Sequence, residues 1–557
     1  MATAVVERPA TARASLARTS AWYRHREWLP VLAVLVAQAV YTIRLIPLGF
    51  ASDDEARYII VGHQLINELF HGGGSPFYDT YFSGAPVIYS PLAAVADSLG
   101  GIVEVQMAST VFMLTATLLL YLTVKRLFGY WPGVLSAGLF AGLGPTQVVG
   151  RNAIYDAMAF MLTGAAAYCA ARTDEGGDRR LLLVPVVLLF ANATKYMTVV
   201  FDPVVIGIAA TRETMVREMV RRAIALAMMT VALLGVAVFI AGDAYLKGIE
   251  FTTLARQAGA NVLLAAEPTN ASGIVAETWD WIGITIALAV LAVIVAVISR
   301  AGAPDVCVLV LCLFASLVVT IEALHLHTSE SMHRHDDVAA WFGSIAGGYV
   351  LGFPCRLSRR DWMAVADMAL GGLIIVTSWA HYGQLPSTYY QASGYDTDNK
   401  PQQDPLYGFL RPYVTDTKRF YLLDGLDDFG LLYHDQVSLP WYRLIDDNYV
   451  KYPIPGRGGD WQGLAQGKTC TSIKPGCMYL EGSAGYQAAI YAHVFAVISV
   501  TRTSLLSTDP VIEQAVERTP GYVLLTTLGG GHTWIYAPDY EHFNTKGQQV
   551  KVRAEAG

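Results

Sequence analysis

The stretch ASDDEARY, residues 51–58, directly follows an apolar run at residues 29–49 that is long enough to cross a membrane. Three acids in a row therefore stand where the chain leaves the bilayer. One explanation is structural, because Ser52 followed by Glu55 matches a capping box and acids stabilise the positive end of a helix. Capping needs only one or two acids, so the full set also indicates chemistry. The three acids are Asp53, Asp54 and Glu55.

The composition of the chain is that of a polytopic membrane protein. Of its 557 residues, 54% are hydrophobic and 15% are charged, a balance that a soluble globular protein rarely shows. The net charge of −7 gives no sign of a nucleic-acid partner. Residues 1–28 carry five arginines and no long apolar core, which predicts a cytoplasmic basic tail rather than a cleaved signal peptide.

Apolar segments predict a transmembrane domain over residues 29–381, a polytopic α-helical arrangement of about eleven spans. The predicted spans are residues 29–49, 102–124, 131–149, 152–171, 181–194, 197–211, 223–243, 280–299, 305–324, 337–353 and 362–381. Short loops rich in arginine and lysine alternate along the chain and stay cytoplasmic by the positive-inside rule. The N-terminus is then inside, whereas the loop 50–101 and everything after about residue 382 are outside.

The last third of the chain changes to a soluble pattern, and we expect residues 382–557 to form a small extracytoplasmic α/β domain. RFYLLDGLDDFG predicts a strand and turn, and DPVIEQAVER predicts a helix with Pro510 in its first turn. GYVLLTT and HTWIYAP predict strands on either side of a Gly-rich turn.

Further ionisable residues gather on the same predicted outer side. Asp156 opens the fourth span, Lys195 lies between two short spans, and HLHTSESMHRHDD at residues 325–337 crowds one short loop. Ionisable groups at such depths are costly unless they are paired or functional. Carboxylates, cations and imidazoles around one cavity suit a reaction in which a phosphate leaves and a hydroxyl loses a proton.

These motifs resemble those of the multispan glycosyltransferases of the GT-C fold, which include the dolichyl-phosphate-mannose protein mannosyltransferases and the bacterial aminoarabinose transferase of lipid A. The resemblance lies in an acidic D-E-x-R-Y motif in the first outer loop, an aspartate that opens the fourth span, and a basic pair before a late span. The matching residues here are Asp54, Glu55, Arg57 and Tyr58, with Asp53 adjacent, then Asp156, then Arg334 and His335.

The resemblance implies transfer of a sugar, with inversion, from a polyprenyl-phosphate carrier to a glycan, protein or lipid acceptor on the outer face of the cell membrane. An acid of the motif, Asp53 or Asp54, would be the general base, with Glu55 beside it and Asp156 orienting the sugar or the acceptor. Arg334 suits the departing phosphate because a guanidinium can bind two phosphate oxygens. The further candidates are His335, Lys195 and Arg57 for the donor phosphate, and Tyr58, Tyr89 and His333 for substrate.

One part of the chain departs from the family pattern. Relatives often carry a lysine before a Pro-rich pair in the first loop, but GAPVIYSPLAA at residues 84–94 has none. Pro86, Tyr89 and Pro91 are expected to keep the shape of that loop.

Other functions remain open at this stage. A transporter or flippase for a lipid-linked sugar is one alternative, although it would place polar groups through the middle of several spans. A membrane protein that binds cell-envelope polymer without catalysis is another. No cofactor is assigned, although the histidines at residues 325–335 could hold a divalent metal. Ala-, Gly- and Arg-rich usage favours a bacterial source, and the identity of the sugar stays open.

Overall fold

The fold is described from a computed structural model of the chain. It describes residues 28–47, 53–71, 86–173, 178–213, 215–241, 269–329, 332–353, 361–392, 420–423, 444–446, 452–455, 477–480, 482–500, 509–526 and 532–536, with Leu246 and Ile249. The basic tail and Ser52 of the predicted capping box lie outside these residues. Of Asp53 only the backbone, at the start of a helix, is described.

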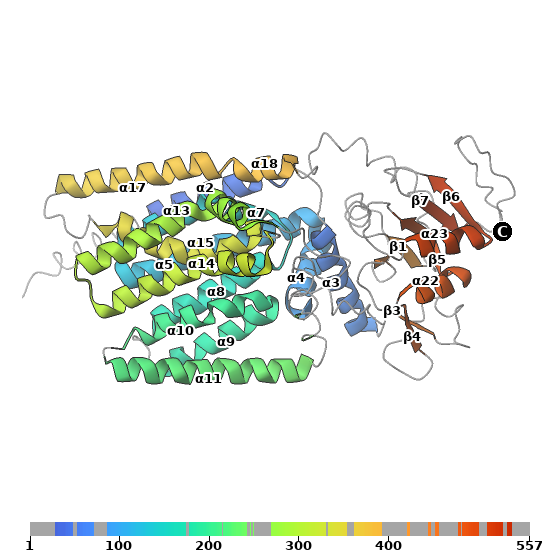
Figure 1. Cartoon of the computed structure of the whole chain (residues 1–557), viewed down its shortest axis with the longest axis horizontal. Coiled ribbons are helices and arrows are strands. Elements are labelled where there is room, and N and C mark those ends of the chain that lie inside the picture. Colours follow the sequence, from blue (N-terminus) through green and yellow to red (C-terminus); the bar gives the residue numbers. More distant parts are fainter. Residues whose placement is uncertain are drawn as a thin grey trace, which may run out of the picture.

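Most described residues form a long bundle of helices (Figure 1). They are α2 (Leu29–Ile43), α5 (Ile102–Phe128), α6 (Tyr130–Ala141), α7 (Gly144–Arg151), α8 (Asp156–Ala171), α9 (Asp178–Thr194), the 3₁₀ helix η1 (Tyr196–Phe201), α10 (Asp202–Ala210), α11 (Val216–Ala241), α13 (Ala271–Ile298), α14 (Ala303–Leu326), α15 (Met332–Leu351), α17 (Asp361–Tyr382) and α18 (Leu385–Ala392). Each segment predicted to span the membrane coincides with helical residues. The apolar runs therefore located the helices of the bundle, although not where each one begins, bends and ends.

Four of the described helices, α5, α11, α13 and α14, are long and apolar enough to cross a membrane. A fifth would be the pair α6 and α7, which is bent by 67° and lies in the single apolar run that predicts one span over 131–149. The bend has a local cause, because Leu143 is extended and Pro145 starts the new helix within its first turn. The remaining predicted spans are shorter or less apolar helices, so the predicted total of about eleven stays a prediction.

Helix α15 is the centre of the bundle, and nearly all its side chains are buried. Small residues allow its neighbours to approach, since a Cβ at Gly348 would collide with the Ser136 hydroxyl on α6. The Trp341 Nε1–H donates to the Ala116 carbonyl of α5 at 3.0 Å, and Phe342 stacks on Phe201 of η1. This packing fixes the position of the first turn of α15, where Arg334 lies.

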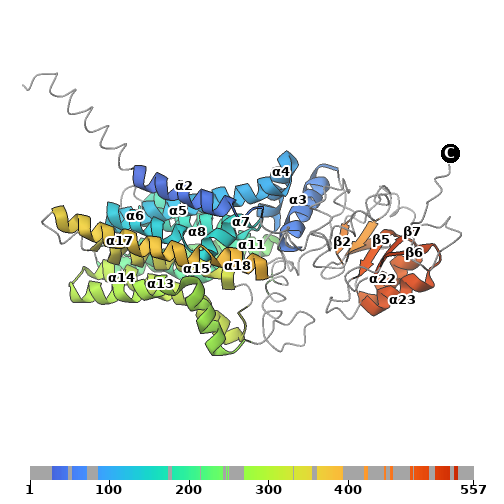
Figure 2. The ribbon, with the colours of Figure 1, turned by 90° about the horizontal axis from the view of Figure 1, so that it is seen from above.

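Two helices, α3 (Asp53–His71) and α4 (Pro86–Gly100), lie between the bundle and the strands of the C-terminal part (Figure 2). The expectation of a loop at residues 84–94 was wrong, because the segment from Pro86 onward is helical even though Pro91 lies inside it. Proline is tolerated at a helix start, and close packing on α3 supports the rest. A Cβ at Gly62 of α3 would collide with the Ser90 carbonyl of α4.

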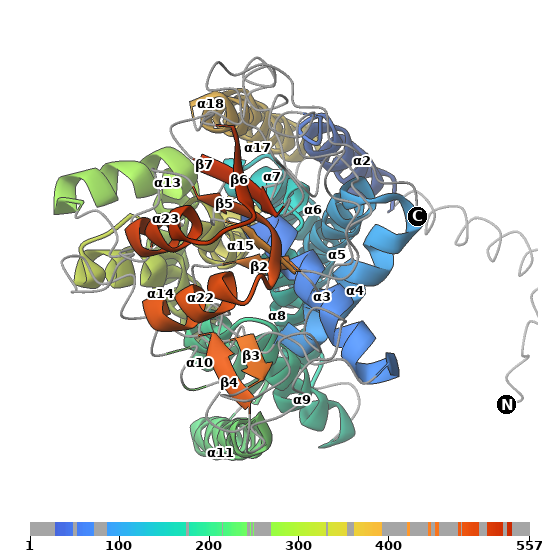
Figure 3. The ribbon, with the colours of Figure 1, turned by 90° about the vertical axis from the view of Figure 1, so that its right-hand side faces the viewer.

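The C-terminal part contains a five-stranded sheet with the order β2-β1-β5-β7-β6, and a separate pair β3-β4. Strand β1 pairs in parallel with β2 and β5, whereas β7 pairs antiparallel with β5 and β6. Two helices, α22 and α23, accompany the sheet on the side of the molecule seen in Figure 3. The bounds are β1 (Phe420–Leu423), β2 (Leu444–Asp446), β3 (Tyr452–Pro455), β4 (Cys477–Leu480), α22 (Gly482–Tyr491), β5 (Phe495–Val500), α23 (Asp509–Arg518), β6 (Tyr522–Thr526) and β7 (His532–Tyr536).

The strands and the helix predicted from RFYLLDGLDDFG, DPVIEQAVER, GYVLLTT and HTWIYAP are present as β1, α23, β6 and β7. Their buried faces supply Leu422, Val516 and Trp534 to one apolar core. Whether this part is an independent domain that begins at residue 382 stays a prediction.

Candidate functional site

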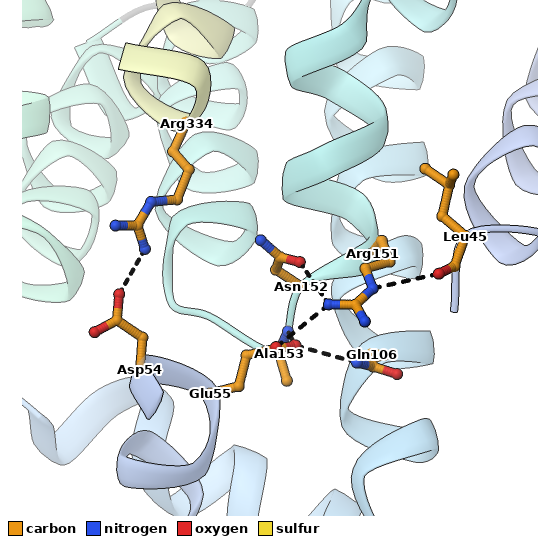
Figure 4. A network of polar contacts seen from close by, with 8 residues as sticks. All are labelled: Leu45, Asp54, Glu55, Gln106, Arg151, Asn152, Ala153 and Arg334. Carbon is orange, nitrogen blue, oxygen red and sulfur yellow. Dashed lines mark hydrogen bonds and ion pairs between the residues drawn. The ribbon is translucent and has the colours of Figure 1, made fainter. Parts of the chain in front are cut away.

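Four segments that are far apart in the sequence meet at the end of the bundle nearest the C-terminal strands. They are the first turn of α3, the connection from α7 to α8, Lys195 before η1, and the first turn of α15. Figure 4 shows the contacts that join three of them. The polar residues that the sequence singled out in these segments form two ion pairs and one buried network.

The first ion pair joins Asp54 of α3 to Arg334 of α15, with 2.6 Å between Oδ2 and Nη1 (Figure 4). The two side chains are 29% and 22% exposed, so this pair remains accessible from outside the protein. Asp156 and Tyr58 are also near enough to act electrostatically on Arg334. The structure thus brings together residues 280 positions apart.

The second ion pair lies deeper. The ammonium group of Lys195 donates to the Asp156 carboxylate, and both side chains are almost fully buried. Asp156 is the first residue of α8, where a carboxylate favours the positive end of the helix. The 3₁₀ turn after Lys195 is held by the Thr198 hydroxyl, which contacts the Lys195 carbonyl and Asn192. The lysine is therefore positioned by its own backbone and by its partner.

Three tyrosine rings pack beside the two ion pairs. The Tyr58 ring lies 4.6 Å from Tyr155 and 6.3 Å from Tyr89, centroid to centroid. The Lys195 ammonium lies 5.4 Å from the Tyr155 ring centroid, within the range of a cation–π contact. Tyr58 follows Asp54 by four residues, which puts both on one face of α3. The rings thus connect the Asp54–Arg334 pair to the Asp156–Lys195 pair.

Glu55 has a different environment from Asp54, although the two residues are adjacent. Successive helical residues point about 100° apart, so Glu55 faces α5 and α7 while Asp54 faces α15. Its carboxylate is completely buried. Gln106 Nε2 donates at 3.1 Å, Arg151 Nη1 at 3.3 Å and the Ala153 backbone N–H at 2.7 Å (Figure 4).

The remaining predicted site residues are close by but mostly in the interior. Arg57, Tyr89 and His335 are buried, and the His333 ring lies 6.2 Å from Trp281 of α13. Their predicted contacts with donor or substrate stay predictions. Within the described part of the chain, no group of three or more His, Cys, Asp or Glu side chains is arranged to hold a metal ion.

Some residues of this region were not given a role by the sequence. Gln106 and Arg151 complete the Glu55 network, and no motif marked Gln106. Asp337 accepts a hydrogen bond from the Thr146 hydroxyl at 2.8 Å, whereas Asp336 is fully buried without a hydrogen-bond partner among the described residues. The polar crowding at residues 325–337 was the signal for the two aspartates, but it did not show which way each one faces.

Comparison with known proteins identifies glycosyltransferases that are similar to this chain in sequence or in fold. Residues 88–241 match the family model of dolichyl-phosphate-mannose-protein mannosyltransferase. ArnT from Cupriavidus metallidurans in the apo state is similar in fold, with a TM-score of 0.56 and 12% identity over 94% of this chain and 99% of that one. The same protein bound to undecaprenyl phosphate gives a TM-score of 0.57 and 11% identity, with coverage of 91% and 98%.

The archaeal oligosaccharyltransferase AglB from Archaeoglobus fulgidus, in complex with an inhibitory peptide and a dolichol-phosphate, has a TM-score of 0.51 and 11% identity, with coverage of 92% and 75%. A short stretch is also 34% identical to the ATP synthase epsilon chain of Cereibacter sphaeroides, over 70% of that protein but only 17% of this chain. That stretch is too small a part of the chain to account for the helical bundle. The structural matches show that the chain has the GT-C fold.

Proposed function

We propose that the chain is an inverting glycosyltransferase that moves a sugar from a polyprenyl-phosphate carrier to an acceptor hydroxyl at the outer face of the membrane. The observation that carries this proposal is the meeting of the ion pairs Asp54–Arg334 and Asp156–Lys195 at one end of a GT-C bundle. The match of residues 88–241 to the mannosyltransferase family and the lipid phosphates bound by ArnT and AglB support it.

In this mechanism Arg334 changes its partner when the donor binds. Without donor, the guanidinium neutralises Asp54 and makes that carboxylate a poor base. A donor phosphate competes for the same guanidinium, to which it can form two parallel hydrogen bonds. Asp54 is then free to take the proton of the acceptor hydroxyl while the acceptor oxygen attacks the anomeric carbon. The bond from that carbon to the phosphate oxygen breaks, and polyprenyl phosphate leaves with its charge held by Arg334.

The Asp156–Lys195 pair has a supporting part in the same step. The lysine adds a second positive charge beside the leaving phosphate. Asp156 keeps the ammonium in place and can accept a hydrogen bond from a hydroxyl of the sugar or the acceptor. The rings of Tyr58, Tyr89 and Tyr155 are buried against one another and form an apolar wall beside the two ion pairs.

Replacing Arg334 by Lys is expected to raise the KM for the donor more than it lowers kcat. Lysine keeps the charge but loses the fork that binds two phosphate oxygens. The loss of one charged hydrogen bond, about 1.5–3 kcal/mol, corresponds to about a 10- to 100-fold increase. Initial rates across donor concentrations measure this effect. Unchanged donor affinity in Arg334→Lys would contradict the assignment of Arg334 to the phosphate.

The lipid chain of the donor has a candidate site next to Lys195. An apolar groove of about 510 Å³ begins at Val199, four residues beyond the lysine, and continues between α10 and α11 past Ala223 and Ala227. Helix α11 lies at the rim of the bundle beside α9 and α10 (Figure 3). A phosphate held at Lys195 would thus place its isoprenoid chain in this groove, within the apolar layer.

Filling the groove by Ala227→Phe is therefore expected to weaken long-chain donors selectively. Each displaced methylene costs about 0.8 kcal/mol, so two displaced groups raise the KM by about tenfold. A donor with a single isoprene unit should be unaffected, and so should both donors with Ala232→Phe, which changes an exposed residue of α11 outside the groove. Equal KM changes for long and short donors would count against this groove.

The proposal is tested by incubating the purified chain in lipid nanodiscs with a panel of radiolabelled polyprenyl-phosphate sugars. With a cell-envelope extract added as the source of acceptor, we expect one donor to be consumed, with its sugar transferred to an acceptor hydroxyl and polyprenyl phosphate released. The identity of that donor defines the sugar. A flippase would move the donor between leaflets without cleaving it, and a polymer-binding protein would leave it intact. Either of those results would refute the proposal that the chain is a glycosyltransferase.

A further inference from the structure

The buried carboxylate of Glu55 is bonded to three different parts of the fold. It accepts hydrogen bonds from Gln106 on α5, from Arg151 at the end of α7, and from the backbone N–H of Ala153 in the connection to α8. Glu55 is 0% exposed, and both its carboxylate oxygens already accept hydrogen bonds from protein groups, Oε1 from Gln106 and Ala153 and Oε2 from Arg151. Glu55 therefore has the geometry of a hydrogen-bond acceptor held in place by the protein, and not that of a general base in an open pocket.

The Glu55 carboxylate connects the chain segments that carry the acids of the two ion pairs. Asp54 directly precedes it on α3, and Ala153 lies three residues before Asp156 at the start of α8. A shift of Glu55 would therefore move Asp54 relative to Arg334 and Asp156 relative to Lys195 at once. The Arg151 guanidinium extends the network to the Leu45 carbonyl just beyond α2, at 3.4 Å.

We propose that Glu55, through its contacts with Arg151 and Ala153, is a positioning residue that sets the distance between Asp54 and Asp156. This role rests on the proposed glycosyltransferase function. It assigns to Glu55 the task of holding the general base in place, rather than the task of accepting the proton. Arg151 has the matching task, because its buried cation would be left without a compensating charge if the Glu55 carboxylate were removed.

A double-mutant cycle with Glu55→Gln and Arg151→Gln tests this role. The amide of Glu55→Gln still accepts from Ala153, but its NH₂ group opposes the donors of Arg151. Misplacement of the base should lower kcat by up to about 100-fold in each single variant, with little change in the donor KM. Because the two residues act as one unit, the double variant should lose no more than the worse single variant.

The pH–rate profile separates positioning from proton transfer. If Asp54 is the base, the residual activity of Glu55→Gln keeps the acidic limb of the wild-type profile at the same pH. A matched control is Glu213→Gln, which breaks a glutamate–arginine pair with Arg222 at the end of α10 away from the site, and should leave kcat unchanged. Folding of each variant is followed by its thermal unfolding, and the uncharged double variant serves where a single variant does not fold.

Each outcome of this cycle has a defined meaning. Three results would each overturn the positioning role without contradicting the proposed glycosyltransferase function. They are loss of the acidic limb in Glu55→Gln, additive losses of kcat in the double variant, and an unchanged kcat in Glu55→Gln. A wild-type chain that consumes no donor would overturn the proposed function, and this role with it.

Discussion

Replacing Asp54 by Asn should lower the rate of sugar transfer by about 100- to 10,000-fold, the usual contribution of a general base. Asparagine has nearly the same shape and can still accept a hydrogen bond from Arg334, but it cannot take a proton from the acceptor. The pair is partly exposed, so its loss should cost only about 0–1 kcal/mol of stability. The measurement is the transfer rate of a variant whose thermal unfolding matches that of the wild type.

Two further variants make this result specific. Asp97→Asn removes a carboxylate from the His63–Asp97 pair between α3 and α4, which lies outside the proposed mechanism, and should keep the wild-type rate. Asp53→Asn should also remain active, because the contact with Arg334 is made by Asp54. An inactive Asp53→Asn beside an active Asp54→Asn would move the base to Asp53.

Replacing Lys195 by Met should abolish transfer and also destabilise the fold by about 3–5 kcal/mol, because Asp156 would be left as a buried, uncompensated charge. Adding Asp156→Asn to Lys195→Met removes that charge and should restore most of the stability. Activity should stay lost in the double variant, since both the cation and the carboxylate of the site are gone. Thermal unfolding and donor turnover, measured on the same preparations, give the two readouts.

The comparison for this second prediction is Arg222→Met, which breaks the partly exposed pair with Glu213 and should cost about 0–1 kcal/mol. If activity returned together with stability in the double variant of Lys195 and Asp156, the pair would be structural only, and the phosphate contact of Lys195 would have to be abandoned.

The helices of the bundle were predictable because each lies in an apolar run, a signal that needs no knowledge of its neighbours, although of the described helices only α5, α11, α13 and α14 are long and apolar enough to cross a bilayer by themselves. The helix α4 was not, because Pro86 and Pro91 argue locally for a loop and only packing on α3 overrides them. The bend between α6 and α7 was missed for a related reason, since one continuous apolar run covers both helices.

The candidate site could be predicted as a set of residues but not as a set of pairs. Shared sidedness pointed to Asp54, Asp156, Lys195 and Arg334, yet which acid meets which cation depends on contacts across 39 and 280 positions. The difference between Asp54 and Glu55 was within reach of the sequence, because adjacent helical residues face different neighbours. The partners of Glu55 were not, since Ala153 contributes a backbone group that no side-chain motif can reveal.

The central statement, that Asp54 activates an acceptor for direct displacement of a phosphate held by Arg334, is tested most directly by the stereochemistry of a single turnover. The donor that the panel identifies is reacted with excess protein, and the anomeric configuration of the product is read by proton NMR. A single displacement predicts an inverted configuration with one polyprenyl phosphate released per sugar transferred. A retained configuration, or transfer that continues at full rate in Asp54→Asn, would contradict it.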